Sequence, residues 1–342
     1  MTITPLWLSG MESGSSLEFS GTIGGVVATA QKKSGVYSWS TNSGGSYGYV
    51  TLPSGLRQIR IGSWFNPMAT ASTFEGNIID IVNSSITQLL GVHGKGSASG
   101  NPLILDVAGT DQDTEGGANE NSIWFHLGID IKVHVSAGWT VVYKNGIEIL
   151  RFEGNTGNAD IFRATFGNFA VGQSVTQYWD DMYIDDTTGE SAPAPLPIKT
   201  FQYLLPNAVG TYNAGDRWPD QIGGYTNRHL VVDDVPVNTS DFVEETTADK
   251  MISFNMTTYT LASNEGCVAA WPIAVCQRIG GTEQIAVGTK IGDDDSIGSD
   301  QTPSNAWAGL RERQTTKPGG GAWDQTAINA IEFLMKSRGT YS

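Results

Sequence analysis

The sequence predicts an all-β protein made of two β-sandwich domains, and three observations support this prediction. The chain contains 42 glycines but only 16% charged residues, a composition that suits β-structure with many tight turns. Short apolar runs alternate with Gly-, Ser- and Asn-rich connections along most of its length. Pro193, Pro195 and Pro197 interrupt both helix and sheet ladders, so they predict a stiff extended connector between two domains.

The proline run sets the predicted domain boundaries. Residues 1–190 form one domain, residues 191–199 the linker and residues 200–342 the second domain. Each part is long enough to bury a core of its own. The strand before the linker alternates, which predicts Met182 and Ile184 on one face and a second set on the other. That second set is Trp179, Asp181, Tyr183 and Asp185.

The first domain shows a succession of short strands and one clear hairpin. Alternation over Ile123–Val135 predicts a long strand with Ile129, Ile131, Val133 and Val135 on one face. Thr140–Tyr143 and Ile147–Phe152 flank Asn145-Gly146, the pair typical of a type I′ turn. The earlier predicted strands are Leu6–Leu8, Val26–Ala30, Val36–Ser40, Gln58–Phe65, Ile78–Val82 and Leu103–Val107.

Three motifs in this domain resemble the concanavalin A-like and laminin-G-like sandwiches. They are Trp124-Phe125-His126, the run Val142-Tyr143-Lys144-Asn145-Gly146, and the late strand Trp179–Asp185. The resemblance covers residues 5–190 and implies a jelly-roll sandwich. It implies a fold and leaves the function open.

The second domain is also strand-like, and its motif order resembles a particular class of protein. Ala327–Met335 fits either helical turns capped by Asp324 or a helical turn that passes into a final strand. Two-part structural proteins of tailed-bacteriophage virions have a similar series of motifs after a concanavalin-like module. The matching residues here are Trp218, His229, Val232–Pro236, Asp241–Val243 and Gly319–Trp323.

This resemblance implies a structural protein of a bacteriophage virion, in capsid decoration or as a minor capsid or tail component. The partners would be other virion proteins and further copies of the chain in a homo-oligomer. The N-terminus lacks a basic segment followed by an apolar one, which predicts synthesis in the host cytoplasm without a signal peptide. The alternative is a glycan-binding adhesin or receptor-binding protein that uses the first sandwich as a lectin for a host glycan.

Composition and missing motifs argue against other classes. A net charge of -15 disfavours nucleic-acid binding, and no apolar run reaches the ~18 residues of a membrane span. A glycoside hydrolase needs paired carboxylates, and the E-x-D-x-E pattern of the fold's β-glucanases does not occur. The sequence therefore predicts a protein that is not an enzyme and has no catalytic residue. Cys267 and Cys276 are predicted to be free buried thiols.

One acidic segment has the spacing of a metal loop. Asp111, Asp113 and Glu115 precede Gly116, as at the start of a calcium-binding loop, but position 12 is Ser122 where such loops have Glu. We predict a solvated acidic loop without a cofactor, and a calcium site at these three acids is the alternative.

Overall fold

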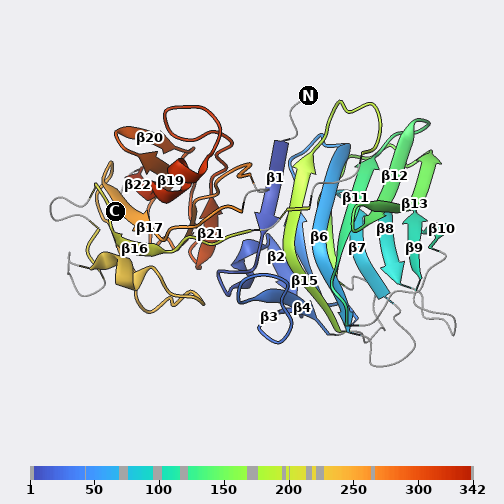
Figure 1. Cartoon of the computed structure of the whole chain (residues 1–342), viewed down its shortest axis with the longest axis horizontal. Helices are drawn as coiled ribbons and strands as arrows, with labels where there is room; N and C mark the ends of the chain where they lie inside the picture. The colour runs from blue at the N-terminus through green and yellow to red at the C-terminus, as the bar shows by residue number, and fades with distance from the viewer. Residues whose placement is uncertain are drawn as a thin grey trace. The chain divides into compact units, whose positions relative to one another are not determined.

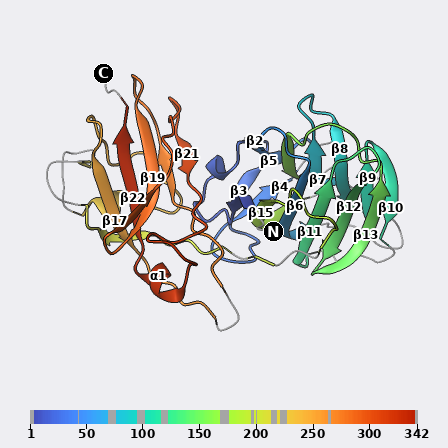
Figure 2. The ribbon, with the colours of Figure 1, turned by 90° about the horizontal axis from the view of Figure 1, so that it is seen from above.

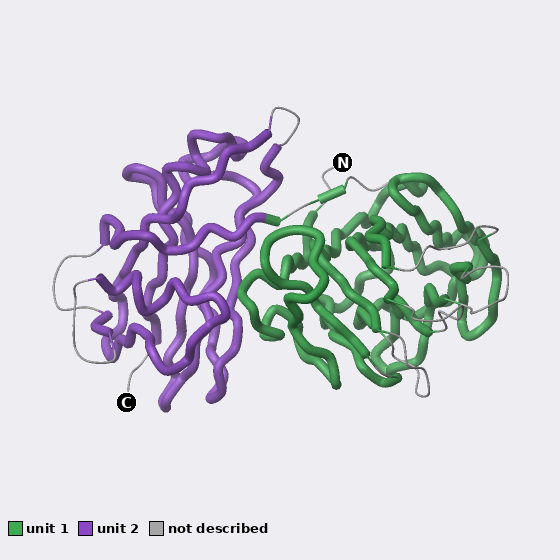
Figure 3. Tube along the Cα trace, turned by 60° about the horizontal axis from the view of Figure 1, so that its bottom comes forward, with its two compact units in different colours: residues 1–201 green, residues 202–342 purple. Residues whose placement is uncertain are grey.

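The computed structural model divides the chain into two compact units, Met1–Phe201 and Gln202–Ser342 (Figure 3). Each is described by itself below. The structure describes residues 4–42, 44–68, 76–94, 102–115, 122–167, 176–194, 198–199, 201–212, 218–220, 227–262 and 266–339.

The first unit is an antiparallel sandwich of an eight-stranded and a seven-stranded sheet (Figures 1 and 2). The first, here the front sheet, contains in order β13 (Ile147–Gly154), β12 (Gly138–Lys144), β11 (Phe125–Lys132), β6 (Gln58–Met68), β15 (Thr176–Asp186), β4 (Ser38–Thr41) and β3 (Val26–Ala28), while β1 (Thr4–Ser9) also pairs with β15. The other, the back sheet, contains β10 (Thr110–Thr114), β9 (Leu103–Val107), β8 (Gln88–Gly94), β7 (Gly76–Val82), β14 (Arg163–Gly167), β5 (Tyr47–Thr51) and β2 (Gly21–Ile23). A short 3-10 helix, η1 (Ser16–Glu18), lies between β1 and β2.

The core of this unit lies between the two sheets, because alternate residues of each strand point inward. Ile59 and Ile61 of β6 share one apolar cluster with Ile129 of β11 and with Leu103 and Leu105 of β9. Val133 is also buried in this cluster, whereas Val135 lies beyond the end of β11 and is half exposed. The predicted all-β sandwich is confirmed.

Strand β15 contains a bulge that the sequence pattern does not reveal. Its pairing with β6 shifts register between Asp180 and Tyr183, and Asp181 has a φ of 46°. The extra residue reverses the alternation, since it lets Trp179 enter the core on the same side as Met182. The prediction that Trp179 shares a face with Tyr183 is therefore wrong.

The predicted hairpin between β12 and β13 is confirmed. Asn145 and Gly146 have φ values of 52° and 80°, the positive pair that a type I′ turn requires. The Asn145 N–H donates to the His126 carbonyl at 2.8 Å, and its side-chain Oδ1 accepts from the His126 N–H at 2.9 Å. The turn is therefore tied to β11 as well as closing the hairpin.

Asn145→Pro should destabilise the first unit strongly. Proline fixes φ near -65° and removes both hydrogen bonds to His126. We expect a loss of more than ~2 kcal/mol, which lowers the melting temperature of a domain of this size by about 4 °C or more. Asn145→Asp is the matched control, because Asp tolerates positive φ and keeps an acceptor oxygen. Equal melting temperatures for parent and proline variant would contradict this account of the turn.

The second unit contains a five-stranded sheet and a two-stranded sheet. The first has the order β16 (Pro206–Val209), β17 (Met251–Met256), β22 (Glu332–Arg338), β19 (Gln284–Ile291) and β20 (Asp294–Ile297), and the second pairs β18 (Ile273–Cys276) with β21 (Ala308–Arg311). The two sheets share one core, in which Ala274 and Cys276 of β18 join Phe254 of β17 and Val287 of β19.

Its helices are short. The 3-10 helix η2 spans Arg228–Val231, and α1 spans Gln325–Asn329. Asp324 caps α1 by accepting from the Ala327 N–H at 2.8 Å, and the chain then enters β22. Of the two structures predicted for Ala327–Met335, a helical turn followed by a strand is the one observed. Within the described part of the chain, no helix has both the length and the apolar character needed to cross a membrane.

Both cysteines are free. Cys276 is buried in the core of the second unit, while Cys267 is only partly buried. Burial raises the pKa of the Cys276 thiol to about 12.

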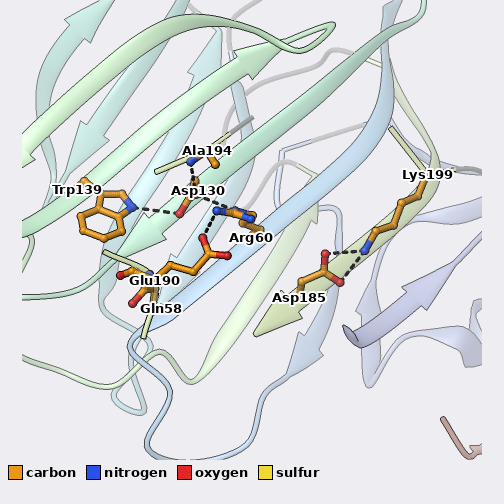
Figure 4. Close-up of polar contacts among 8 residues, drawn as sticks. All are labelled: Gln58, Arg60, Asp130, Trp139, Asp185, Glu190, Ala194 and Lys199. Carbon is orange, nitrogen blue, oxygen red and sulfur yellow. Dashed lines mark hydrogen bonds and ion pairs between the residues drawn. The ribbon is translucent and has the colours of Figure 1, made fainter. Parts of the chain in front are cut away.

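The connector packs against the outer face of the front sheet (Figure 4). There Arg60 Nε and Asp130 Oδ2 form an ion pair at 2.8 Å, with side chains only 4% and 0% exposed. Glu190 pairs with Nη2 of the same guanidinium, and the Ala194 N–H donates to Asp130 Oδ2 at 3.1 Å. Trp139 Nε1 donates to Asp130 Oδ1 at 3.0 Å, so both carboxylate oxygens have partners.

Contacts with the first unit continue to the end of the connector. Lys199 Nζ donates to Asp185 Oδ1 at 2.7 Å, and the Phe201 N–H donates to Asp181 Oδ1 at 3.0 Å. The Phe201 ring meets Tyr183 edge-on, with centroids 6.5 Å apart. Residues 195–197 of the predicted linker lie outside the described residues. The described part of this linker, which was predicted to be a spacer, belongs to the first unit.

A fragment that ends at residue 190 should therefore be less stable than one that ends at residue 203. The shorter fragment loses the Ala194, Lys199 and Phe201 contacts and leaves Asp130, Asp181 and Asp185 with fewer partners. Hydrogen bonds to charged groups contribute about 1.5–3 kcal/mol each, so we expect a melting temperature at least about 5 °C lower. Thermal unfolding of the two fragments followed by circular dichroism measures this. Equal stability would mean that the connector contributes nothing to the fold.

Candidate ligand-binding face of the first sandwich

A row of paired residues, most of them polar, crosses the outer face of the back sheet. The register of five strand pairs aligns it, and each member is the direct partner of the next. From β5 to β10 the row reads Tyr49, Thr165, Asp80, Gly91, Asp106 and Asp111.

Asp80, at the centre of the row, is fully buried in a network of donors. Asn77 Nδ2 lies 2.8 Å from both carboxylate oxygens, and Gln88 Nε2 donates to Oδ1 at 2.8 Å. A side chain at Gly91 would occupy the place of this Gln88 amide, since an added Cβ would lie 2.1 Å from Nε2. Burial raises the pKa of Asp80 to about 7, the Asn77 hydrogen bonds oppose this, and the charge of Asp106 adds to it.

Aromatic and cationic groups occupy the β5 end of the row. The guanidinium of Arg163 lies 3.8 Å above the ring centroid of Tyr49, and Tyr47 lies beside that ring at 6.3 Å. All three side chains are partly exposed. Aromatic faces beside polar donors are a common arrangement for binding small polar ligands.

At the other end of the row, three potential metal ligands converge. His93 of β8, Asp106 of β9 and Asp111 of β10 each offer one ligand atom, and these atoms lie within 4.8 Å of one another. His93 Nε2 is 3.5 Å from Asp111 Oδ1. Asp106 Oδ1 also accepts from the Gly109 N–H at 2.7 Å, which fixes the orientation of its carboxylate.

The acids of the predicted acidic loop have separate partners in the structure. The segment is strand β10, and Asp113 Oδ2 turns toward β13, where it accepts from the Arg151 N–H at 2.9 Å. Glu115 accepts from the Leu103 N–H at 3.4 Å and lies 3.5 Å from Lys144 Nζ. Strand pairing with β9 straightens the segment, so Thr110–Thr114 is a strand where a solvated loop was predicted. The alternative of a calcium site at Asp111, Asp113 and Glu115 stays a prediction. Asp111 is the one acid of the three that lies in the group with His93 and Asp106.

The residues that sequence reasoning missed are Asp80, His93 and Asp106. Asp80 and Asp106 interrupt the apolar runs Ile78–Val82 and Leu103–Val107, and a charged residue inside a buried strand is a signal of a special role. Their mutual proximity depends on the pairing of β7, β8 and β9, which local pattern does not reveal.

A second group of buried carboxylates holds the loop before β4. Asp180 Oδ2 accepts from the N–H groups of Lys33 and Ser34 at 2.8 and 3.0 Å, and the Ser34 hydroxyl donates to Asp181. Glu12 accepts from the Val36 N–H at 2.8 Å. Burial raises the pKa values of Asp180 and Asp181. The charge of Asp181 adds to this for Asp180, and the charge of Glu12 does so for Asp181. These acids cap backbone donors, which gives them a structural role.

Comparison with known proteins gives only distant likenesses. No family model matches the chain, and no curated protein matches it. Among solved structures, the chain is similar to "Cellulose induced protein, Cip1" at 14% identity and a TM-score of 0.40, over 53% of this chain and 97% of that one. It is similar to Caenorhabditis elegans galectin LEC-6 at 10% identity and a TM-score of 0.30, over 42% and 94%. It is also similar to the Emp47p carbohydrate recognition domain at 12% identity and a TM-score of 0.33, over 48% and 88%. Likeness at this level does not transfer a ligand or an activity.

The raised pKa of Asp80 should make stability fall as pH rises. An unfolded Asp releases its proton near pH ~3.9, whereas folded Asp80 does so at about 7. Between these values the folded state binds more protons, so the free energy of unfolding decreases by up to about 1.4 kcal/mol per pH unit. Asp180 and Asp181 act in the same direction.

Denaturant unfolding of the full chain and of Asp80→Asn between about pH 5 and about pH 8 measures this dependence. The variant should have a flatter slope and gain stability relative to the parent as pH rises. Asp186→Asn is the control, because that carboxylate is partly exposed and accepts from the Thr188 N–H of the turn that follows β15. Parallel slopes for parent and Asp80→Asn would mean that Asp80 is ionised in the folded protein throughout.

Proposed function

We propose that the first unit is a glycan-binding module and that the outer face of the back sheet is its binding surface. The observation that carries the proposal is the partly exposed stack of Arg163 on Tyr49, with Tyr47 beside it. Sugars present C–H faces that pack on aromatic rings and hydroxyls that pair with amides and guanidinium groups. A neutral or acidic saccharide fits this set of groups.

The same geometry favours binding without turnover. Asp80 and Asp106 lie on either side of β8, which separates their backbones by ~9.5 Å, a spacing that could suit a pair of catalytic carboxylates. Asp80, however, is fully buried, and both its oxygens accept hydrogen bonds from side-chain amides. A carboxylate in that position has no access to a glycosidic oxygen, so we propose that the protein is not an enzyme.

The structural role in a bacteriophage virion, its partner proteins and self-association stay predictions from the order of sequence motifs. Glycan binding is the function proposed first because the Tyr49–Arg163 stack supports it. A virion protein that recognises a host glycan would combine the two functions. Localisation in a virion also stays a prediction.

A glycan array probed with the full chain tests the proposal, followed by calorimetry with each saccharide that binds. Tyr49→Ala and Arg163→Ala should each weaken binding by about tenfold or more, the equivalent of ~1.4 kcal/mol. Arg151→Ala is the matched control, because this exposed arginine lies on β13 of the front sheet and pairs with Glu148. An array without any bound saccharide, or equal affinities for all variants, would overturn the proposal.

A further inference from the structure

His93, Asp106 and Asp111 meet on three adjacent strands at the β10 end of the row. Rigid main-chain pairing sets their separation, because β9 pairs with both β8 and β10. The His93 side chain is 24% exposed and that of Asp111 51%, so a small ion has a direct path to both. Asp106, on the strand between those of His93 and Asp111, is almost buried.

The distance between imidazole and carboxylate is the informative measurement. His93 Nε2 and Asp111 Oδ1 are 3.5 Å apart, longer than the ~2.7–3.2 Å of a good hydrogen bond. Two ligand atoms that each lie ~2.0–2.1 Å from one tetrahedral ion are ~3.3 Å apart. The separation of these two atoms is therefore closer to that of two ligands of one metal ion than to that of a hydrogen bond.

The ligand types select the kind of ion. Calcium takes six to eight oxygen ligands, and an imidazole nitrogen is foreign to that set. One imidazole with two carboxylates suits zinc and neighbouring first-row divalent ions, and three protein ligands leave a position open to water or another small ligand. The Gly109 N–H on Asp106 Oδ1 supplies the outer-sphere contact that orients such a carboxylate.

We propose that His93, Asp106 and Asp111 bind one divalent transition-metal ion, with zinc as the best fit. The site differs in residues and chemistry from the calcium site that the sequence offered as an alternative, since it uses Asp111 but neither Asp113 nor Glu115. It is independent of the proposed glycan binding, which depends on the opposite end of the row.

Isothermal titration of the metal-free full chain with Zn²⁺, and separately with Ca²⁺, tests the site. We expect one Zn²⁺ per chain and a weaker response or none to Ca²⁺. His93→Gln and Asp106→Asn should each weaken Zn²⁺ binding at least about tenfold, since each removes one of three ligands. His134→Gln is the matched control, because His134 lies in the same unit and its ring Nδ1 accepts from the Ser136 and Ala137 N–H groups.

Co²⁺ gives a second readout that separates loss of a ligand from loss of the fold. Co²⁺ bound to the parent and to His134→Gln should give the visible absorption of a tetrahedral site, and the spectrum should change in His93→Gln while its circular dichroism stays that of the parent. No Zn²⁺ binding, Zn²⁺ binding unchanged in His93→Gln, or tighter binding of Ca²⁺ than of Zn²⁺ would each overturn the proposal. None of these results bears on Tyr49 or Arg163, so failure here and failure of glycan binding are distinguishable.

Discussion

The buried ion pair between Arg60 and Asp130 constrains the architecture of the first unit. Two charges that are 4% and 0% exposed are tolerable only if every remaining donor and acceptor has a partner. Trp139 supplies one partner from the neighbouring strand, Glu190 supplies another just before the connector, and Ala194 supplies a third from within it. The chain that leaves β15 must therefore return across the front sheet. This requirement makes the connector a part of the sandwich.

The consequence is an asymmetry between the two outer faces. On the front sheet, the connector meets the charges that the strands present, and Lys199 and Phe201 extend this contact toward β15. On the back sheet, partly exposed groups with hydrogen-bonding and stacking capacity remain at both ends of a buried centre. Binding chemistry is thus expected on the back sheet, where the strands present polar groups that the connector does not occupy.

Local sequence patterns predicted local geometry well. Asn145-Gly146 specified the turn because few residue pairs adopt positive φ twice, and the apolar runs gave the strands because burial requires alternation. The bulge at Asp181 was missed, since a residue in the left-handed region leaves no mark on a hydrophobic pattern. It reversed the predicted face of Trp179.

The candidate site was the part that the sequence revealed least. Asp111 was singled out for its spacing to Asp113 and Glu115, a local criterion, whereas its actual neighbours come from β8 and β9. Contacts between strands depend on register, and register is decided by the whole sheet. Asp80 and Asp106 carried a usable signal, because each is an acid inside an apolar run. His93 carried none until the pairing of β8 with β9 was known.

The buried centre of the row makes its two ends separable. Asp80, Asn77 and Gln88 form a closed set of hydrogen bonds between the Tyr49–Arg163 stack and the His93 cluster, and Gly91 leaves room for the Gln88 amide. A substitution at Asp80 would disturb this network and so could affect both ends, which makes it a probe of stability. Substitutions at Arg163 or His93 leave the network intact, since neither side chain takes part in these bonds. Ligand recognition at one end and ion binding at the other can therefore be assigned to different residues on one rigid sheet.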